Sequence, residues 1–299
     1  MRHAFEVSSI AERTRLRATS VPPATYFVGS AVFHYLGPAF AVLLFAAVEP
    51  LGVAWLRIAT AAAVFALWRK PWRRWPELGA RKRQLILAFG ATLGVMNGCF
   101  YLAIERLPLG TVAAIEFLPV IALAALGART ARNALALVVA VAGVYLLTDV
   151  LLLSEPLGFA FAFANAGLFA LYIVVGHRVS RQPTLGGIDG LAAAMLVALV
   201  VATPIGGWAA IPALTDPVVL VAAIGVGLAS SVVPYVCDQL AMARMARSTY
   251  ALLVSLLPAT ATVVGIVVLA QIPSGQEVLG VALVVGGVVI HRETGVSST

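Results

Sequence analysis

Two charged residues interrupt long apolar stretches of this sequence and are the first candidates for chemistry. Arg57 lies within WLRIATAAAVFALW, and Glu116 lies within GTVAAIEFLPVIALAAL, three residues before Pro119. A charge near the bilayer centre costs at least about 2.5–3.5 kcal/mol on insertion scales, so residues of this kind mark binding sites or ion pathways. We therefore expect Arg57 and Glu116 to act on a charged ligand or on a proton.

The spacing places these charges at one depth in the membrane. At a rise of about 1.5 Å per residue, Arg57 lies about 9 Å below the outer end of its predicted helix, and Glu116 and Asn97 lie about 10 Å below theirs. This depth predicts a polar cluster lining a cavity, in which the opposite charges compensate each other. Pro119 cannot donate to the carbonyl of Ile115 and so leaves a free acceptor beside Glu116. A structural ion pair between two helices is the alternative.

Further polar residues join the candidate substrate-binding or coupling residues. Tyr101 lies one turn beyond Asn97, on the same predicted helix face. The others are His34, Tyr235, Asp238 and Ser255, with Ser230 and Ser231 as weaker candidates and Pro119 and Pro258 as helix breaks. Three alternatives stay open: a packing role for His34, bonds from the serines to their own helix backbone, and a solvated position for Asp238 at the cytoplasmic end.

The composition places these residues in membrane helices. Of the 299 residues, 61% are hydrophobic and only 11% are charged, and the mean hydropathy is +0.99. Soluble domains have about a quarter of their residues charged. The length leaves room for about ten spans of about 20 residues each. The predicted spans are residues 26–47, 51–68, 84–104, 109–127, 133–148, 157–175, 190–207, 217–237, 248–269 and 277–291.

The loop charges predict the orientation. Residues 69–83 carry seven lysines and arginines, whereas the alternate loops carry Glu49, Glu105, Glu155 and Asp216. Cytoplasmic loops are enriched in lysine and arginine, so both termini are expected in the cytoplasm. The net charge of +7 is then a topology signal, and no nucleic-acid partner is expected. The first two dozen residues contain no apolar core of a cleavable signal peptide.

The two parts of the chain show a weak internal similarity. A shift of 139 residues places Pro119 on Pro258 and keeps the apolar positions in register. Since the shift spans five helices, an odd number, the second part would be inverted in the membrane, as in many secondary transporters. We predict an all-α polytopic protein of ten transmembrane helices in two inverted five-helix repeats. The predicted parts are a cytoplasmic tail (1–24), the two repeats (25–148 and 149–292) and a second cytoplasmic tail (293–299).

Several other classes of protein are disfavoured. The two cysteines, Cys99 and Cys237, lie in different predicted spans and form neither a disulfide framework nor a metal site. The sequence has no His-Glu-x-x-His pair, no Gly-x-Ser-x-Gly turn and no phosphate-binding loop. We therefore expect no cofactor and no metal. A membrane-embedded enzyme and a non-transporting scaffold remain the alternatives to a transporter.

Three segments carry a family resemblance: WLRIATAAAVFALWRKPWR, GVMNGCFYLAIERLPLGTVAAIEFLP and SSVVPYVCDQLAMARMARSTYALLVSLLP. Through them the chain resembles the drug/metabolite transporter superfamily (EamA-type), in its threonine/homoserine exporter-like branch. The resemblance implies a bacterial inner-membrane exporter of amino acids or related small metabolites, driven by an ion gradient, with protons as the expected coupling ion. Such relatives often have an acidic residue where this chain has Leu257, so the implied substrate need not be threonine or homoserine.

Overall fold

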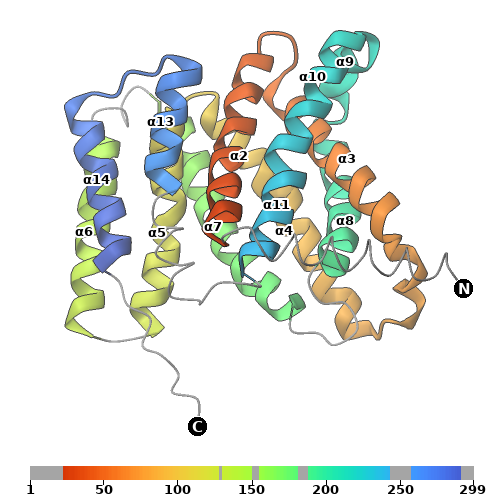
Figure 1. Cartoon of the computed structure of the whole chain (residues 1–299), viewed down its shortest axis with the longest axis horizontal. Coiled ribbons are helices and arrows are strands. Elements are labelled where there is room, and N and C mark those ends of the chain that lie inside the picture. The colour runs from red at the N-terminus through yellow and green to blue at the C-terminus, as the bar shows by residue number, and fades with distance from the viewer. Residues whose placement is uncertain (1–22, 128–129, 150–154, 181–187, 243–256, 291–299) are drawn as a thin grey trace, which may run out of the picture.

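The structure, a computed structural model, describes residues 23–127, 130–149, 155–180, 188–242 and 257–290. All regular elements within these ranges are helical (Figure 1). The long helices are α2 (Pro23–Leu44), α3 (Pro50–Arg69), α4 (Ala80–Ile104), α5 (Leu109–Gly127), α6 (Ala131–Asp149), α7 (Pro156–Ser180), α8 (Ile188–Gly206), α10 (Pro217–Gly227), α11 (Val233–Met242), α13 (Leu257–Leu269) and α14 (Gly275–Ile290). The short elements are η1 (Pro71–Arg73), η2 (Trp75–Glu77), η3 (Trp208–Ala210), α9 (Ile211–Thr215) and the π-helical turn η4 (Leu228–Val232).

The observed helices follow the predicted spans. Each predicted span overlaps a helix, and α10, η4 and α11 together form the one predicted at 217–237. Residues 248–256 of the ninth span lie outside the described residues. Among the described residues, five helices are long and apolar enough to cross a membrane, and shorter apolar helices accompany them. The prediction of an all-helical protein with membrane-spanning segments is confirmed at this level.

Prolines and polar side chains start several helices. Pro50 and Pro217 occupy first helical positions, where a missing N–H costs little because that donor has no partner inside the helix. Asp216 caps α10 by accepting from the backbone N–H groups of Val218 and Val219 at 2.8 and 3.3 Å. Ser274 and Glu277 cap α14 reciprocally through their side chains and backbone N–H groups.

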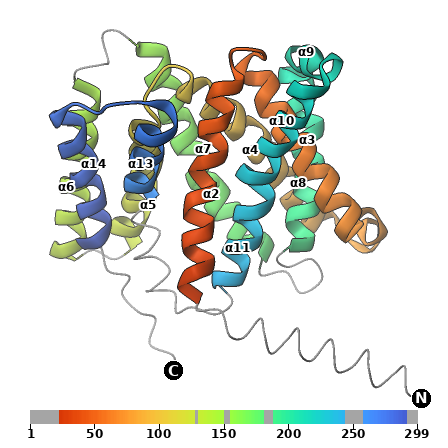
Figure 2. The ribbon, with the colours of Figure 1, turned by 45° about the horizontal axis from the view of Figure 1, so that its top comes forward.

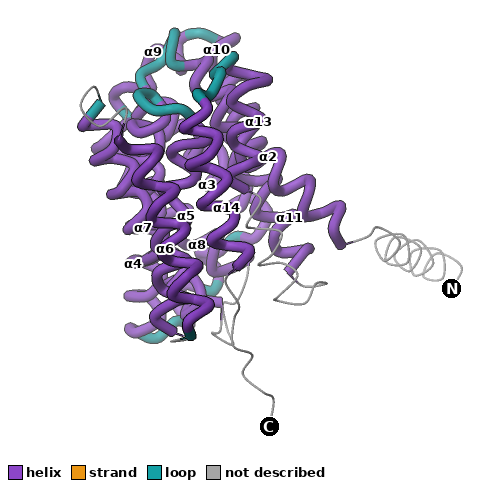
Figure 3. The backbone as a smooth tube through the Cα atoms, turned by 90° about the vertical axis from the view of Figure 1, so that its left-hand side faces the viewer, coloured by secondary structure: helices purple, strands orange, loops and turns teal. Residues whose placement is uncertain are grey.

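The outer surface of the bundle is apolar, as a lipid environment requires. Val200, Val218 and Val267 are 72%, 78% and 76% exposed. A protein that kept these side chains in water would leave large apolar patches on its surface. The loops gather at the two ends of the bundle (Figure 3).

The two ends of the bundle differ in charge. The connection between α3 and α4 and the start of α6 carry basic residues, among them Arg73, Arg81 and Arg132, and we call this the basic end. The connections from α2 to α3 and into α10 carry Glu49 and Asp216 at the opposite, acidic end (Figure 1).

Close packing joins helices that are distant in sequence. Helix α2 lies beside α11 (Figure 2), and α6 lies beside α14. At Gly90 and Gly94 of α4, an added Cβ would meet the carbonyl oxygens of Ala194 and Ala198 of α8 at 2.5 and 3.0 Å. These glycines permit the close approach of two helices, which is the packing role expected for small residues in membrane helices.

Two apolar core clusters divide α3, α4 and α7 between them, and the second also takes in α8 from Leu191 to Ala202. The first gathers residues near the acidic end, such as Val53 and Leu107, and the second gathers residues near the basic end, such as Phe65 and Leu78. On α3 the border between the clusters falls between Leu56 and Ile58, beside the buried Arg57.

Candidate functional site

A cluster of buried polar side chains lies at the border between the two apolar clusters. On α3, Leu56 belongs to the first apolar cluster and Ile58 to the second, so Arg57 stands between them. We call the residues of this site the polar cluster: Tyr35, Arg57, Tyr101, Glu116, Asn165, Ser230 and Ser231, each at most 7% exposed. The site therefore includes both charged residues predicted from the sequence, Arg57 and Glu116.

Arg57 is held by the π-helical turn η4. Its Nε donates to Ser231 Oγ at 2.8 Å, and its Nη2 donates to the carbonyl of Ser230 at 2.8 Å. Its guanidinium lies over the ring of Tyr101, 5.6 Å from the centroid, in cation–π geometry. These bonds use two of the five guanidinium donors, so Arg57 can also bind a ligand.

The carbonyl that Arg57 binds lacks its regular α-helical donor because of the local sequence. In a regular α-helix the carbonyl of Ser230 would accept from residue 234, but Pro234 has no N–H. The chain forms the π-helical turn Leu228–Val232 directly before α11. Single π turns inside helices are frequent at functional sites. Arg57 thus replaces a missing backbone donor, and this explains why its charge is oriented toward η4.

Helix α2 crosses η4 at a glycine. A Cβ added at Gly37 would lie 2.4 Å from Cβ of Ser230 and 2.6 Å from its backbone. Only a residue without a side chain allows this contact. The backbone of α2 therefore supports the turn that binds Arg57.

Glu116 has a different partner. Its Oε1 accepts from Nδ2 of Asn165 on α7 at 3.1 Å, and Asn165 is fully buried. Within the described part of the chain, no hydrogen bond or ion pair joins Glu116 to Arg57, although the two charges are close enough to interact electrostatically. The two charges thus compensate each other across the cluster, while their direct contacts are with other helices.

Three buried polar atoms in the cluster have no hydrogen-bond partner: Tyr35 Oη, Tyr101 Oη and Asn165 Oδ1. The Tyr35 hydroxyl lies within electrostatic reach of Glu116. The Tyr101 hydroxyl lies close to Arg57 and Ser230 without hydrogen-bond geometry. Buried polar groups are nearly always paired, so a group of three unpaired atoms requires an explanation.

The other predicted residues have varied positions. Asn97 is buried, but its Nδ2 donates to the carbonyl of Leu93 in its own helix at 2.8 Å. His34 is half-buried, with its ring 5.4 Å from that of Tyr35 in an edge-on arrangement. Tyr235 is half-buried on α11 and packs against the second apolar cluster.

The remaining predictions concern two prolines, Ser255 and Asp238. Pro119, predicted as a helix break, lies inside α5, which continues to Gly127. Pro258 is the second residue of α13, and its carbonyl accepts from Thr262 Oγ1 at 3.0 Å. Ser255 and the side chain of Asp238 lie outside the described part of the chain.

The sequence interpretation missed Asn165 and Tyr35. Asn165 lies in the apolar run FAFANAGLFALY, where a lone amide is the same signal that identified Asn97. Tyr35 follows His34 and is the more deeply buried of the two, at 1% exposed. A lone uncharged polar side chain in an apolar helix is a weaker signal than a buried charge, and the sequence interpretation used it for Asn97 but not for Asn165 or Tyr35.

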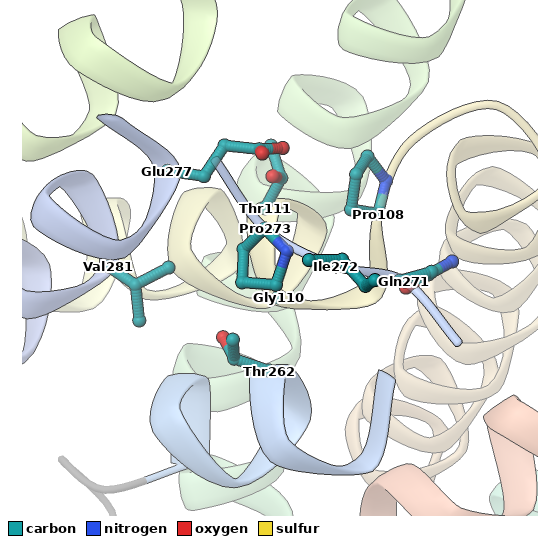
Figure 4. A pocket seen from close by; sticks show the side chains of 9 residues that line it. All are labelled: Pro108, Gly110, Thr111, Thr262, Gln271, Ile272, Pro273, Glu277 and Val281. Atoms are coloured by element: carbon teal, nitrogen blue, oxygen red, sulfur yellow. The ribbon is translucent and has the colours of Figure 1, made fainter. Parts of the chain in front are cut away.

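A separate pocket lies at the acidic end between α5, α13 and α14 (Figure 4). Its lining residues are Pro108, Gly110, Thr111, Thr262, Gln271, Ile272, Pro273, Glu277 and Val281. Two of its polar groups already serve the backbone, since Gln271 Oε1 accepts from the N–H of Leu109 and Glu277 caps α14. None of these residues belongs to the polar cluster. Among the described residues there is also no group of three potential metal ligands.

A bundle of apolar helices around a buried polar cluster suits a membrane transport protein, and the chain belongs to the EamA-like transporter family. The family model matches residues 156–291, which span α7 to α14. The chain is 30% identical over 252 residues to the threonine/homoserine exporter RhtA of Salmonella typhimurium strain LT2, covering 83% of this chain and 84% of that protein. It is also 30% identical over 266 residues to RhtA of Escherichia coli K12, covering 88% and 87%. The family expected from the sequence is thus confirmed.

Proposed function

We propose that the protein is a secondary transporter that exports small amino acids of the threonine/homoserine type, or related small metabolites, across a bacterial inner membrane. The observation that carries the proposal is the burial of two opposite charges, Arg57 and Glu116, in one polar cluster. The membership of the chain in a transporter family supports it. A zwitterionic amino acid brings a carboxylate for Arg57 and an ammonium group for Glu116. Such a ligand matches both charges at once, so one molecule can bind both Arg57 and Glu116.

We propose that the helices form two inverted five-helix repeats, α2–α6 and α7–α14. The packing supports this, because contacts recur when each helix is replaced by its counterpart five spans later. The contact of α4 with α7 corresponds to that of α11 with α2, that of α5 with α7 to that of α13 with α2, and that of α4 with α8 to that of α10 with α3. The family model also begins at Pro156, the first residue of α7.

Transport then proceeds by alternating access between the two repeats. The polar cluster is closed in the present conformation, since its residues are almost fully buried. A ligand reaches it only when the helices separate toward one end. Sites between inverted repeats near the bilayer midplane are typical of secondary transporters.

The proposal is tested with purified protein in liposomes. Accumulation of labelled threonine inside the vesicles, without chemical change, is the result expected for a transporter. Chemical conversion of the solute would instead support an enzyme, and neither flux nor conversion would support a scaffold. Either of those results would overturn the proposed function.

We propose that the basic end is cytoplasmic, because cytoplasmic loops are enriched in lysine and arginine. Arg73 is exposed at the basic end and Glu49 at the acidic end. The test uses Arg73→Cys and Glu49→Cys separately, each with Cys99 and Cys237 replaced by serine. An impermeant thiol reagent added to intact cells should label the cysteine at 49 and spare the one at 73. The opposite labelling would reverse the orientation.

Glu116 is proposed to carry the coupling proton. A carboxylate that exchanges its partner between Asn165, the ligand ammonium group and a proton links ligand movement to proton movement. Glu116→Gln removes the titration and keeps the shape, so it should abolish accumulation driven by a pH gradient and retain slow downhill exchange. Glu77→Gln, at an exposed site of the basic end, is the control. Full response of Glu116→Gln to the pH gradient would leave Glu116 with a structural role.

A further inference from the structure

The three unpaired polar atoms of the cluster are the starting point. Tyr35 Oη, Tyr101 Oη and Asn165 Oδ1 are buried without a hydrogen-bond partner, and their side chains are 1%, 0% and 0% exposed. Leaving a buried donor or acceptor unpaired is unfavourable. Because three atoms of one buried cluster are unpaired, we infer that a ligand completes their hydrogen bonds when it enters the site.

The direction of the Asn165 amide defines what one of these atoms can bind. Its Nδ2 donates to the Glu116 carboxylate, which accepts only, so the amide oxygen is directed away from that bond. Asn165 Oδ1 is then an acceptor that needs a donor from a ligand. Because Asn165 is bonded to Glu116, that donor lies beside the carboxylate, where a positively charged donor is favoured.

The two hydroxyls divide between the two charges. Tyr35 Oη lies within electrostatic reach of Glu116, and Tyr101 Oη lies near Arg57, whose guanidinium covers the Tyr101 ring. A phenolic hydroxyl both donates and accepts. Tyr35 can therefore accept from a cation held at Glu116, and Tyr101 can donate to an anion held at Arg57.

We propose that Asn165 and Tyr35 complete an ammonium subsite with Glu116 and that Tyr101 completes a carboxylate subsite with Arg57. This assignment rests on the proposed function and names the ligand class more narrowly. The ligand is a free α-amino acid with both charged groups unblocked, since each end leaves polar atoms unpaired when its group is missing. Amines, carboxylic acids and amides of amino acids each satisfy only one subsite.

The first test uses tyrosine variants, because removal of an unpaired hydroxyl separates a ligand role from a structural one. In the ligand-free protein, Tyr35→Phe and Tyr101→Phe remove an unsatisfied buried atom, so the melting temperature should stay equal or rise. The rise in melting temperature caused by threonine should become smaller in both variants. Tyr145→Phe, on the exposed face of α6 and away from the polar cluster, is the control and should keep the full rise in melting temperature caused by threonine.

The second test asks which end of the ligand each residue recognises. Competitors of labelled threonine transport are threoninol, which lacks the carboxylate, and 3-hydroxybutyrate, which lacks the ammonium group. A lost hydrogen bond to a charged group lowers affinity by about 10-fold or more. Asn165→Leu should weaken inhibition by threoninol by about 10-fold and leave inhibition by 3-hydroxybutyrate unchanged, and Tyr101→Phe should do the reverse.

The outcomes separate this inference from the proposed function. If the parent protein neither transports amino acids nor is stabilised by them, the proposed function fails. If the parent protein transports threonine but Tyr35→Phe and Tyr101→Phe lower the ligand-free melting temperature and keep the full threonine effect, the hydroxyls bind water or protein only, and the inference is overturned. If every variant weakened inhibition by threoninol and by 3-hydroxybutyrate equally, the assignment of separate ammonium and carboxylate subsites would also be overturned. Where an analogue does not compete in the parent protein, the melting measurements decide.

Discussion

The helices α2–α6 and the helices α7–α14 contribute differently to the buried site. The first group supplies the charges, Arg57 and Glu116, whereas the second group supplies neutral partners, Ser231 for Arg57 and Asn165 for Glu116. The two groups of helices thus have separate roles at the site. Each charge is held by a helix of the other group, so any movement between the groups changes the environment of both charges.

The same division recurs at the basic end, with one difference. Arg69 and Arg74, from the first group, bind Asp189 at the start of α8 at 2.5 and 2.8 Å. Here the partner is charged, and the two arginine side chains are 36% and 57% exposed. At these four contacts between the two groups, the charges have neutral partners where they are buried and a charged partner where they meet solvent.

The largest expected effect is at Arg57. Arg57→Leu leaves the Ser230 carbonyl and the Ser231 hydroxyl without their donor, at about 1–3 kcal/mol for each group that becomes unsatisfied, and should abolish transport. A double-mutant cycle with Ser231→Ala should give a coupling energy of about 0.5–3 kcal/mol in unfolding measurements in mixed micelles. The cycle of Arg57→Leu with Glu116→Gln should give a smaller value, because those side chains share no direct contact.

A larger coupling energy for Arg57 with Glu116 than for Arg57 with Ser231 would contradict the view that each charge is held by the other group of helices. It would mean that the two charges act as one ion pair inside the first group. Arg57→Lys is the companion variant, since it retains the charge and loses the planar fork that binds two acceptors together. Its transport activity should be intermediate.

The next effect is expected at the crossing of α2 and η4. Gly37→Ala places a methyl group 2.4 Å from Cβ of Ser230, so the turn must shift, at a cost of about 1–3 kcal/mol for overpacking. The shift should also weaken the Arg57 bond to Ser230 and reduce transport. Gly29→Ala is the control on the same helix, because its nearest neighbour is Cys237 Sγ at 3.9 Å. Equal stability of the two variants would show that α2 does not support η4.

Most of the helices can be predicted from the sequence. The hydrogen-bond partners of Arg57 and Glu116 cannot. Long apolar runs bounded by Pro50, Pro108 and Pro217 predict helices because a membrane helix must satisfy its backbone internally. The depth of Arg57 and Glu116 follows from helical rise alone. Which helix faces each charge depends on rotation and register, and these are determined by packing at positions such as Gly37 and Gly94.

The π-helical turn illustrates the limit of sequence reasoning. Pro119 and Pro234 both remove a backbone donor from a helix, and the sequence interpretation used only the first. The structure places Arg57 opposite the carbonyl freed by Pro234, a contact between residues more than 170 positions apart. No local pattern contains such a pairing. The sequence nevertheless contains both parts of this pairing: a proline that removes a backbone donor, Pro234, and an arginine in an apolar helix, Arg57.

A smaller effect is expected where the two groups pack without any charge. An added Cβ at Gly287 of α14 would meet the carbonyl of Ala136 on α6 at 2.7 Å, whereas an added Cβ at Gly286 meets nothing within 4 Å. Gly287→Ala should destabilise the protein by about 1–3 kcal/mol and leave the ratio of competitor affinities unchanged. Gly286→Ala should have no destabilising effect. A changed ligand preference in Gly287→Ala would mean that α6 and α14 also shape the site.

The smallest effect is expected for the ionic contact at the basic end. Asp189→Asn removes a charge that binds two arginines, but exposed ion pairs contribute about 0–1 kcal/mol because water screens them. Asp189 also lies in the first turn of α8, where a carboxylate interacts favourably with the helix dipole. The destabilisation should therefore be measurable at low salt and diminish at high salt, as screening by ions shortens the range of the attraction. Glu77→Gln, an exposed carboxylate at the same end, is the control and should show less salt dependence. If Asp189→Asn were as damaging as Arg57→Leu and insensitive to salt, the contact would be part of the conformational change, and the contrast between buried neutral and exposed ionic contacts would fail.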